Sequence, residues 1–200
     1  MAPCTIISAI LCVLVIVVAI IISFSTPNWA SFEKNPSVEL CGCTSCDCGM
    51  WLSCNGAFLQ DGSIENCNWF FSNGFEIERE LPGWFKIVQG LMSGAVVTSV
   101  LSLILGLLSL CCRCKRCNPY QTTGAFLGLT FVLVTAAVCV FGIIGHIQHN
   151  IEVLATGQAN LQHNTFSWSF WIAVGAAVLS FSTSLVYFCA GRSSVQEECV

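Results

Sequence analysis

The stretch that decides the fold is IISAILCVLVIVVAIIISF, residues 6–24, which contains no Asp, Glu, Lys or Arg. Three later stretches share this composition, and the four measure 19 to 26 residues each. A helix of about 20 apolar residues crosses the roughly 30 Å hydrocarbon core of a bilayer. We therefore predict four transmembrane helices, at residues 6–24, 87–112, 123–145 and 166–190.

The composition of the chain supports this prediction. Of its 200 residues, 55% are hydrophobic and only 9% are charged, whereas a soluble domain has about 25% charged residues. In a soluble core, four such stretches would have no polar face for water. A cleaved signal peptide at 6–24 is disfavoured, because no basic residue precedes it and Phe24–Pro27 is a poor cleavage site. We interpret residues 1–200 as a single membrane domain.

Basic residues indicate how the helices are oriented. Arg113, Lys115 and Arg116 lie between the second and third stretches without an acidic neighbour, and Arg192 follows the fourth. Because Lys and Arg near span ends stay in the cytoplasm, we expect this loop and both termini to be cytoplasmic. The predicted segments are a cytoplasmic loop at 113–122, a cytoplasmic tail at 191–200, and extracellular loops at 25–86 and 146–165.

The long extracellular loop is acidic and rich in turns. It has eight acidic and three basic residues, a net charge of −5. Asn-Gly or Asp-Gly pairs at 55–56, 61–62 and 73–74 separate short apolar runs such as 57–60 and 69–71, a pattern typical of hairpins. The predicted fold is an all-α membrane protein, a four-transmembrane-helix bundle with a small extracellular antiparallel β-sheet from this loop.

The cysteines of this loop form the densest motif in the sequence. An even number of cysteines in an oxidising compartment favours disulfides. A zinc site at the first four is one alternative, but its spacers are very short and its exposed thiolates would oxidise. A redox-active C-x-x-C pair at Cys43 and Cys46 is another. The loop contains Cys41, Cys43, Cys46, Cys48, Cys54 and Cys67.

A second group of cysteines lies at the predicted cytoplasmic end of the second helix. Juxtamembrane thiols among basic residues are typical S-acylation sites, so we expect palmitoylation here. Metal binding by the C-C-x-C-x-x-C run is the competing interpretation. The group comprises Cys111, Cys112, Cys114 and Cys117.

The apolar stretches offer little for catalysis or transport. They contain no ionisable residue apart from Cys and Tyr, whereas proton relays and solute pathways use charged groups or His at depth. We expect no enzymatic activity, no cofactor and no metal. The small residues Gly124, Gly128 and 175–177 indicate close helix packing. We expect His146, His149 and His163, which have no matching carboxylates or cysteines, to be solvated loop residues rather than a zinc site or a pH sensor.

Several motifs together carry a resemblance to a known family. Trp29, then Gly49-Met50-Trp51-Leu52-Ser53-Cys54, then Cys67, resembles the Trp…Gly-Leu-Trp-x-x-Cys…Cys signature of the claudin and peripheral myelin protein superfamily, with Met50 in place of Leu. Leu81-Pro82 followed by Gly90-Leu91-Met92 is similar to the claudin stretch Leu-Pro…Arg-Ala-Leu-Met. The four-span topology also matches.

The chain departs from the family pattern in three places. Gln89 stands where the family has Arg, and the four cysteines between 41 and 48 have no counterpart in ordinary claudins. The short loop lacks the Asn-Pro turn common in claudins. These departures indicate a divergent, invertebrate-like member.

The resemblance implies a disulfide between Cys54 and Cys67 that ties a hairpin. It also implies that Trp29 and Trp51 wedge between the sheet and the helix ends, although a generic interfacial anchor is the alternative for Trp51. Pairing among the other four loop cysteines stays open, and a nested 41–48 and 43–46 arrangement is a guess.

The resemblance also implies a function. We expect a multi-pass plasma-membrane protein at tight or septate cell–cell junctions, associating with membrane lipids and with homologous proteins in cis and trans as a homo- or hetero-oligomer. It would form a paracellular barrier or a cation-favouring pore, for which Asp61 and Glu65 are charge-selectivity candidates. The alternative is an auxiliary subunit or membrane organiser regulating a channel or receptor by lateral contact. The tail Glu198-Cys199-Val200 suggests binding to a PDZ scaffold.

Overall fold

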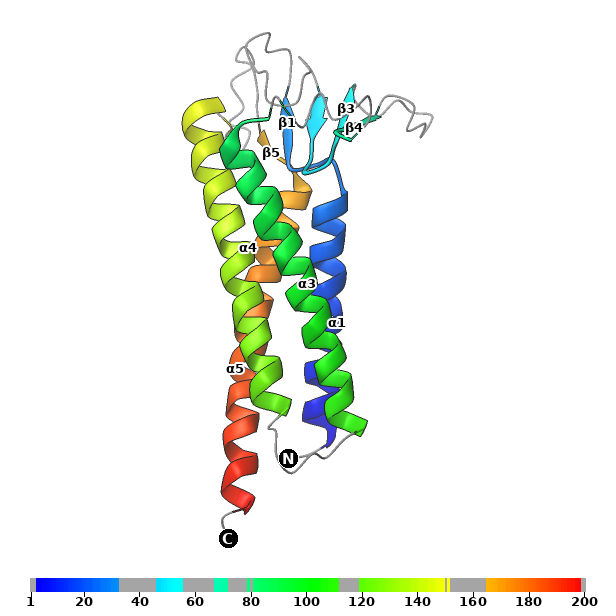
Figure 1. The fold of residues 1–200 in the computed structure, drawn as a ribbon, viewed down its shortest axis with the longest axis vertical. Coiled ribbons are helices and arrows are strands. Elements are labelled where there is room, and N and C mark those ends of the chain that lie inside the picture. Colours follow the sequence, from blue (N-terminus) through cyan, green and yellow to red (C-terminus); the bar gives the residue numbers. More distant parts are fainter. Residues whose placement is uncertain are drawn as a thin grey trace. The chain divides into compact units, whose positions relative to one another are not determined.

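The computed structural model describes residues 3–32, 46–55, 67–71, 79, 81–111, 119–149, 151 and 165–198. Figure 1 shows these residues as long helices and short strands. The helices are α1 (Pro3–Ser25), α3 (Gly83–Cys111), α4 (Pro119–His149) and α5 (Trp168–Glu198). The strands are β1 (Ala30–Phe32), β2 (Cys46–Cys48), β3 (Leu52–Asn55), β4 (Cys67–Trp69) and β5 (Thr165–Phe166).

The four predicted transmembrane helices are confirmed. In the described residues, four helices are long and apolar enough to cross a membrane, with apolar windows at Ser8–Ser25, Gly83–Ser109, Tyr120–Ile147 and Trp168–Arg192. The boundary of the fourth is corrected: the helix begins at Trp168, two residues after the predicted start. Phe166 continues the apolar run but lies in β5, so composition alone placed it in the helix.

The chain divides into two compact units. One, which we call the sheet unit, comprises residues 22–90 and 136–173 and contains all five strands. The other, the helical unit, comprises residues 1–21, 91–135 and 174–200. Within the helical unit, the start of α1 and the end of α5 lie at the same end (Figure 1), as an even number of spans requires.

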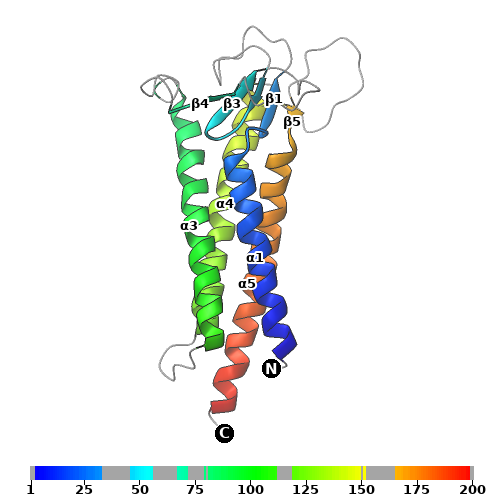
Figure 2. The same ribbon diagram turned by 90° about the vertical axis from the view of Figure 1, so that its right-hand side faces the viewer.

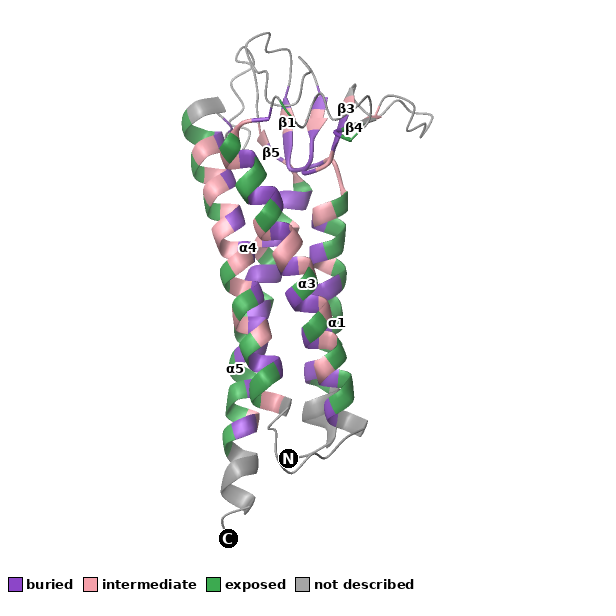
Figure 3. Ribbon diagram, in the orientation of Figure 1, coloured by how far each residue is buried: buried purple, intermediate pink, exposed green. Residues whose placement is uncertain are grey.

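Buried and exposed residues follow one another along each described helix (Figure 3). The exposed large side chains are apolar, and the buried residues include both large apolar side chains, such as Ile16 and Leu127, and Ser and Thr. The exposed residues of α1 include Leu14, Val15 and Val18. The buried polar residues include Ser99 and Ser102 of α3 and other Ser and Thr residues of the helices. In water this distribution would leave a large apolar surface exposed, but lipid solvates that surface. The pattern is that of membrane-spanning helices.

Hydroxyl groups connect α3 and α4 in the helical unit. The Oγ1 atoms of Thr98 and Thr130 lie 2.8 Å apart and are buried, and the same hydroxyls reach the carbonyls of Ala95 and Phe126 on their own helices. Interhelical hydrogen bonds of this kind contribute roughly 0.6 to 2 kcal/mol in membranes.

Glycines bring α4 close to α5, as the small-residue pattern predicts. A Cβ at Gly124 would lie 3.2 Å from the Cβ of Tyr187, and one at Gly128 would lie 3.4 Å from the Oγ of Ser184. The Ser184 hydroxyl donates a hydrogen bond of 2.8 Å to the carbonyl of Gly124. Gly175 differs, because a Cβ there would meet no atom within 4 Å.

The sheet is antiparallel, with strand order β4-β3-β2-β1-β5. Figure 2 shows β4 and β5 at its opposite edges. The first four strands come from the long loop, as predicted. The fifth, which was not predicted, comes from the short loop and pairs Ser31 with Thr165. The predicted strand at 69–71 is displaced, because β4 ends at Trp69 and Phe70 and Phe71 form a turn, while 57–60 lies outside the described residues.

We predict that Gly124→Val destabilises the protein, because the added atoms would overlap Tyr187 and the backbone of Ser184. The expected cost is about 1–3 kcal/mol, seen as a lower midpoint of thermal unfolding in detergent. Gly175→Val, in the same unit but with open space, is the matched control and should leave the midpoint nearly unchanged. Equal shifts for the two variants would contradict the packing described here.

Candidate functional site

The candidate site is the junction between the sheet and the helix ends inside the sheet unit, and Trp29 lies at its centre. Pro27 has no N–H to bond the carbonyl of Ser23, so α1 ends there with an unsatisfied acceptor. The indole Nε1 of Trp29 donates to that carbonyl at 2.7 Å, and the ring is fully buried. Trp29 therefore completes the end of α1.

The backbone on either side of Trp29 joins other elements. The Trp29 N–H donates to the carbonyl of Cys48, and its carbonyl accepts from the N–H of Ser167 at 3.0 Å. The carbonyl of Asn28 accepts from the N–H of Ser169, which is one of the orphan donors in the first turn of α5. Residues 28–29 thus cap one helix while starting the sheet.

Hydroxyl groups make a second link between the ends of α1 and α5. Ser23 Oγ donates to the carbonyl of Ser169 at 2.9 Å, and the Thr26 Oγ1 and Ser169 Oγ atoms lie 2.7 Å apart. Nearby, the amide Nδ2 of Asn28 donates to the Asp47 carboxylate at 3.2 Å. These polar contacts fix α1, α5 and β2 relative to one another within the unit.

The Gly49-Met50-Trp51-Leu52 motif forms the turn between β2 and β3. The N–H of Gly49 donates to the carbonyl of Leu52 at 3.0 Å, which closes the turn. A Cβ at Gly49 would collide with the carbonyl oxygen of Thr26 and would lie 2.5 Å from the Cα of Pro27. Only glycine allows this turn to approach the end of α1 so closely.

Gln89 holds the turn from the side of α3. Its side chain is 3% exposed, and its Nε2 donates to the carbonyl of Met50 at 2.8 Å. Met50 itself is fully buried. At the position where the family has Arg, a neutral amide therefore bonds the turn backbone directly.

Trp51 acts through its ring. It stacks on Phe71 with centroids 5.2 Å apart and meets Phe24 edge-on at 5.4 Å. Its Nε1 is buried and has no hydrogen-bond partner in the described part of the chain. The two signature tryptophans thus differ: the Trp29 side chain donates a hydrogen bond and packs, whereas among the described residues the Trp51 side chain only packs.

Aromatic rings fill the space beneath the sheet. Phe141 of α4 is fully buried and lies 5.1 Å from Trp29, 6.1 Å from Phe170 and 6.2 Å from Phe166, centroid to centroid. Phe166 and Phe170 stack at 4.5 Å. This cluster gathers Trp29, the residue before β1, with residues of β5 and α5 around one ring of α4.

The cysteines of the long loop that the structure describes are oxidised. Cys54 and Cys67 occupy opposite positions of β3 and β4 and form a disulfide, as the resemblance implied. In the loop-entropy account, a loop of this size gives a bond worth about 3 kcal/mol. Cys46 and Cys48 are also disulfide-bonded, which is incompatible with zinc ligation by their thiolates. Their partners, and the connectivity predicted for Cys41 and Cys43, lie outside the described residues.

The other predicted site residues are only partly described. Cys111 is the last residue of α3 and Glu198 the last of α5. His146 was predicted to be solvated, but it also contacts the protein, because its Nδ1 lies 3.0 Å from the carbonyl oxygen of Ile151. His149 ends α4. Outside the described residues lie Asp61, Glu65, Cys112, Cys114, Cys117, Cys199, Val200 and His163.

Sequence reasoning missed several residues that build the site. Ser23, Asn28, Ser169 and Phe141 look like ordinary polar or apolar residues near span ends. One signal was present, since Pro27 two residues before Trp29 shows that α1 ends with an orphan carbonyl near an indole donor. Among the described residues, no group of three or more His, Cys, Asp or Glu could hold a metal.

These features define a class of protein: a four-span membrane protein with a disulfide-braced sheet clamped to its own helix ends by a buried tryptophan. Residues 14–189 match the family described as PMP-22/EMP/MP20/Claudin tight junction. The chain belongs to this family. A comparison with curated proteins gave no match.

We predict that Trp29→Phe destabilises the protein more than Trp51→Phe. The first change removes a buried donor and leaves the Ser23 carbonyl unpaired, at a cost of about 1–3 kcal/mol, whereas the second removes an indole N–H that has no partner in the described residues. The measurement is the thermal midpoint of each purified variant, with retention of the Cys54–Cys67 bond checked by mass spectrometry. A larger loss for Trp51→Phe would contradict these assignments.

Proposed function

We propose that this protein is a claudin-like component of cell–cell junctions in the plasma membrane. Its sheet unit associates with those of homologous proteins side by side in one membrane and head-on between cells. The assembly seals the paracellular space or conducts cations selectively through it. Family membership supports this proposal, and the geometry of the sheet unit carries it.

The decisive observation is the fixed attachment of the sheet to the helix ends. Trp29, the hairpin turn at 49–52 and Gln89 bond the strands to α1, α3 and α5. A surface that is held in one orientation loses little conformational freedom when it meets a partner, so more of its contact energy appears as affinity. A rigid platform suits recognition between membranes.

The interior of the described helices favours this function over transport. Its buried polar groups are mainly Ser and Thr hydroxyls, several of which bond carbonyls of their own helices, such as Ser102 to Thr98 and Ser180 to Ala176. Charged residues that line solute pathways or proton relays are not found among the buried residues of the described part of the chain. The outer sheet is thus the better candidate for the working surface.

A second candidate function is lateral regulation of a channel or receptor. Gly175 on α5 is exposed and has open space around it, which would let a neighbouring transmembrane helix approach closely.

The proposed PDZ contact would serve either function. Because α5 continues to Glu198, strand addition by the tail would require its last turn to unwind. Acylation at 111–117 stays a proposal for sorting within the membrane.

Depletion of the protein from a polarised epithelium that expresses it tests the junction proposal. We expect a tagged copy to concentrate at cell–cell contacts and transepithelial resistance to change when the protein is removed. Re-expression of the wild-type chain should restore the resistance. Uniform distribution over non-contacting membrane with unchanged resistance would instead support the lateral role.

A more specific prediction concerns the charge selectivity of the proposed pore, and it rests on the net negative charge of the long loop. If Asp61 and Glu65 border an aqueous path, each carboxylate attracts cations by about 1 kcal/mol at 4 Å in bulk water and more in a confined pore. Screening over about 8 Å limits the effect to near charges. Changing Asp61→Asn with Glu65→Gln should lower the sodium-to-chloride permeability ratio measured from dilution potentials. An unchanged ratio with junctional strands intact would make the protein a seal.

A further inference from the structure

Large aromatic side chains are exposed on the sheet unit in two places. Trp69, at the end of β4, is 54% exposed, and Phe71, in the following turn, is 45% exposed. Trp168 and Trp171, in the first turn of α5, are each 46% exposed. Burial of aromatic rings dominates the energetics of cores and interfaces, so four exposed rings on one small unit require an explanation.

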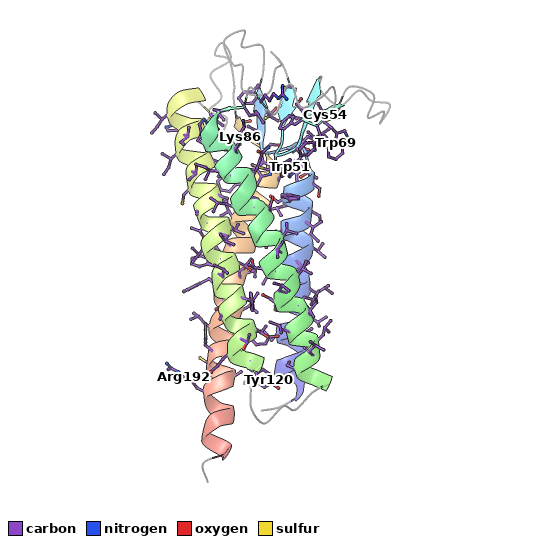
Figure 4. All side chains as sticks on the ribbon, viewed as in Figure 1. Trp51, Cys54, Trp69, Lys86, Tyr120 and Arg192 are labelled. Atoms are coloured by element: carbon purple, nitrogen blue, oxygen red, sulfur yellow. A yellow bond between two sulfur atoms is a disulfide. The ribbon has the colours of Figure 1, made fainter. Side chains whose placement is uncertain are left out.

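The contacts place these rings at one level along the helices. Phe71 stacks on Trp51, and Trp51 meets Phe24 in the last turn of α1. At the start of α5, Ser169 bonds Ser23, the residue next to Phe24. Both aromatic groups therefore lie beside the end of the first transmembrane helix, and Figure 4 shows Trp51, Cys54 and Trp69 close together at the sheet.

The surface of α1 next to the rings has the exposed apolar side chains of a lipid-facing surface. Ile22, two residues before Phe24, is 40% exposed and belongs to the apolar face of α1. Residues 67–71, which form β4 and the turn after it, carry no charge. Tryptophan is enriched at the headgroup level of membranes because its ring is apolar and its indole N–H is polar. The exposed rings thus continue the lipid-facing surface upward into the interface.

We propose that Trp69 and Phe71, together with Trp168 and Trp171, bind the glycerol and headgroup layer of phospholipids in the leaflet next to the sheet. The β3–β4 hairpin, closed by Cys54 and Cys67, then rests on the membrane. This anchors the edge of the sheet farthest from β5. The inference does not depend on the proposed junction function.

Photolabelling of the full chain tests this assignment. The protein is reconstituted at a low protein-to-lipid ratio in phosphatidylcholine vesicles that contain a phosphatidylcholine with a diazirine beside the glycerol, and adducts are mapped by mass spectrometry. We expect adducts on Trp69, Phe71, Trp168 and Trp171 several-fold above those on buried Trp29, which serves as the internal control. Ile22 serves as the reference for lipid contact.

A double variant provides the second measurement. Trp69→Ser with Phe71→Ser should lose the adducts at 69–71 and keep those at Trp168 and Trp171, which also shows that the variant remains folded. Labelling of Ile22 without labelling at 69–71 in the wild type would overturn the proposal. So would a loss of the lipid adducts at 69–71, with those at Ile22 kept, as the protein-to-lipid ratio rises, since a second copy of the protein would then cover these rings.

Discussion

The sheet unit depends on how its first helix ends. Pro27 cannot donate to the carbonyl of Ser23, and the indole of Trp29 supplies the missing hydrogen bond. A ring in that position must also pack against Phe141 and Phe170, and the backbone beside it must cap α5. This hydrogen bond and the backbone and hydroxyl contacts beside it therefore set the positions of two helix ends and of the first strand.

The remaining contacts extend this constraint outward. Gly49 lets the β2–β3 turn lie against residues 26–27, and Gln89 bonds that turn from α3. The Cys54–Cys67 disulfide then joins the outermost pair of strands. Because β5 pairs with β1, the two loops share one sheet. A partner that binds either loop would act on a single folded surface, which is consistent with a role in recognition.

The features that sequence predicted are those with a local or motif-based signal. The composition of residues 6–24 predicts a transmembrane helix, and the positions of Trp51 and Cys54 in a family signature predict their roles. The features it missed are set by partners distant in the chain. Thr165–Phe166 is too short to show alternation, so the sequence places Thr165 in the short loop and Phe166 at the start of a helix. Gln89 bonds a backbone carbonyl 39 positions away, and no side-chain pattern reveals that.

Gln89 has a physical consequence for the conditions in which the sheet stays attached. An attraction that relies on a cation weakens as dissolved ions screen it, and its strength follows the protonation of neighbouring acids. A neutral amide that donates to the carbonyl of Met50 in a buried position has neither dependence. The hydrogen bond from Gln89 to Met50 therefore holds the hairpin turn to α3 without a charged or titratable group.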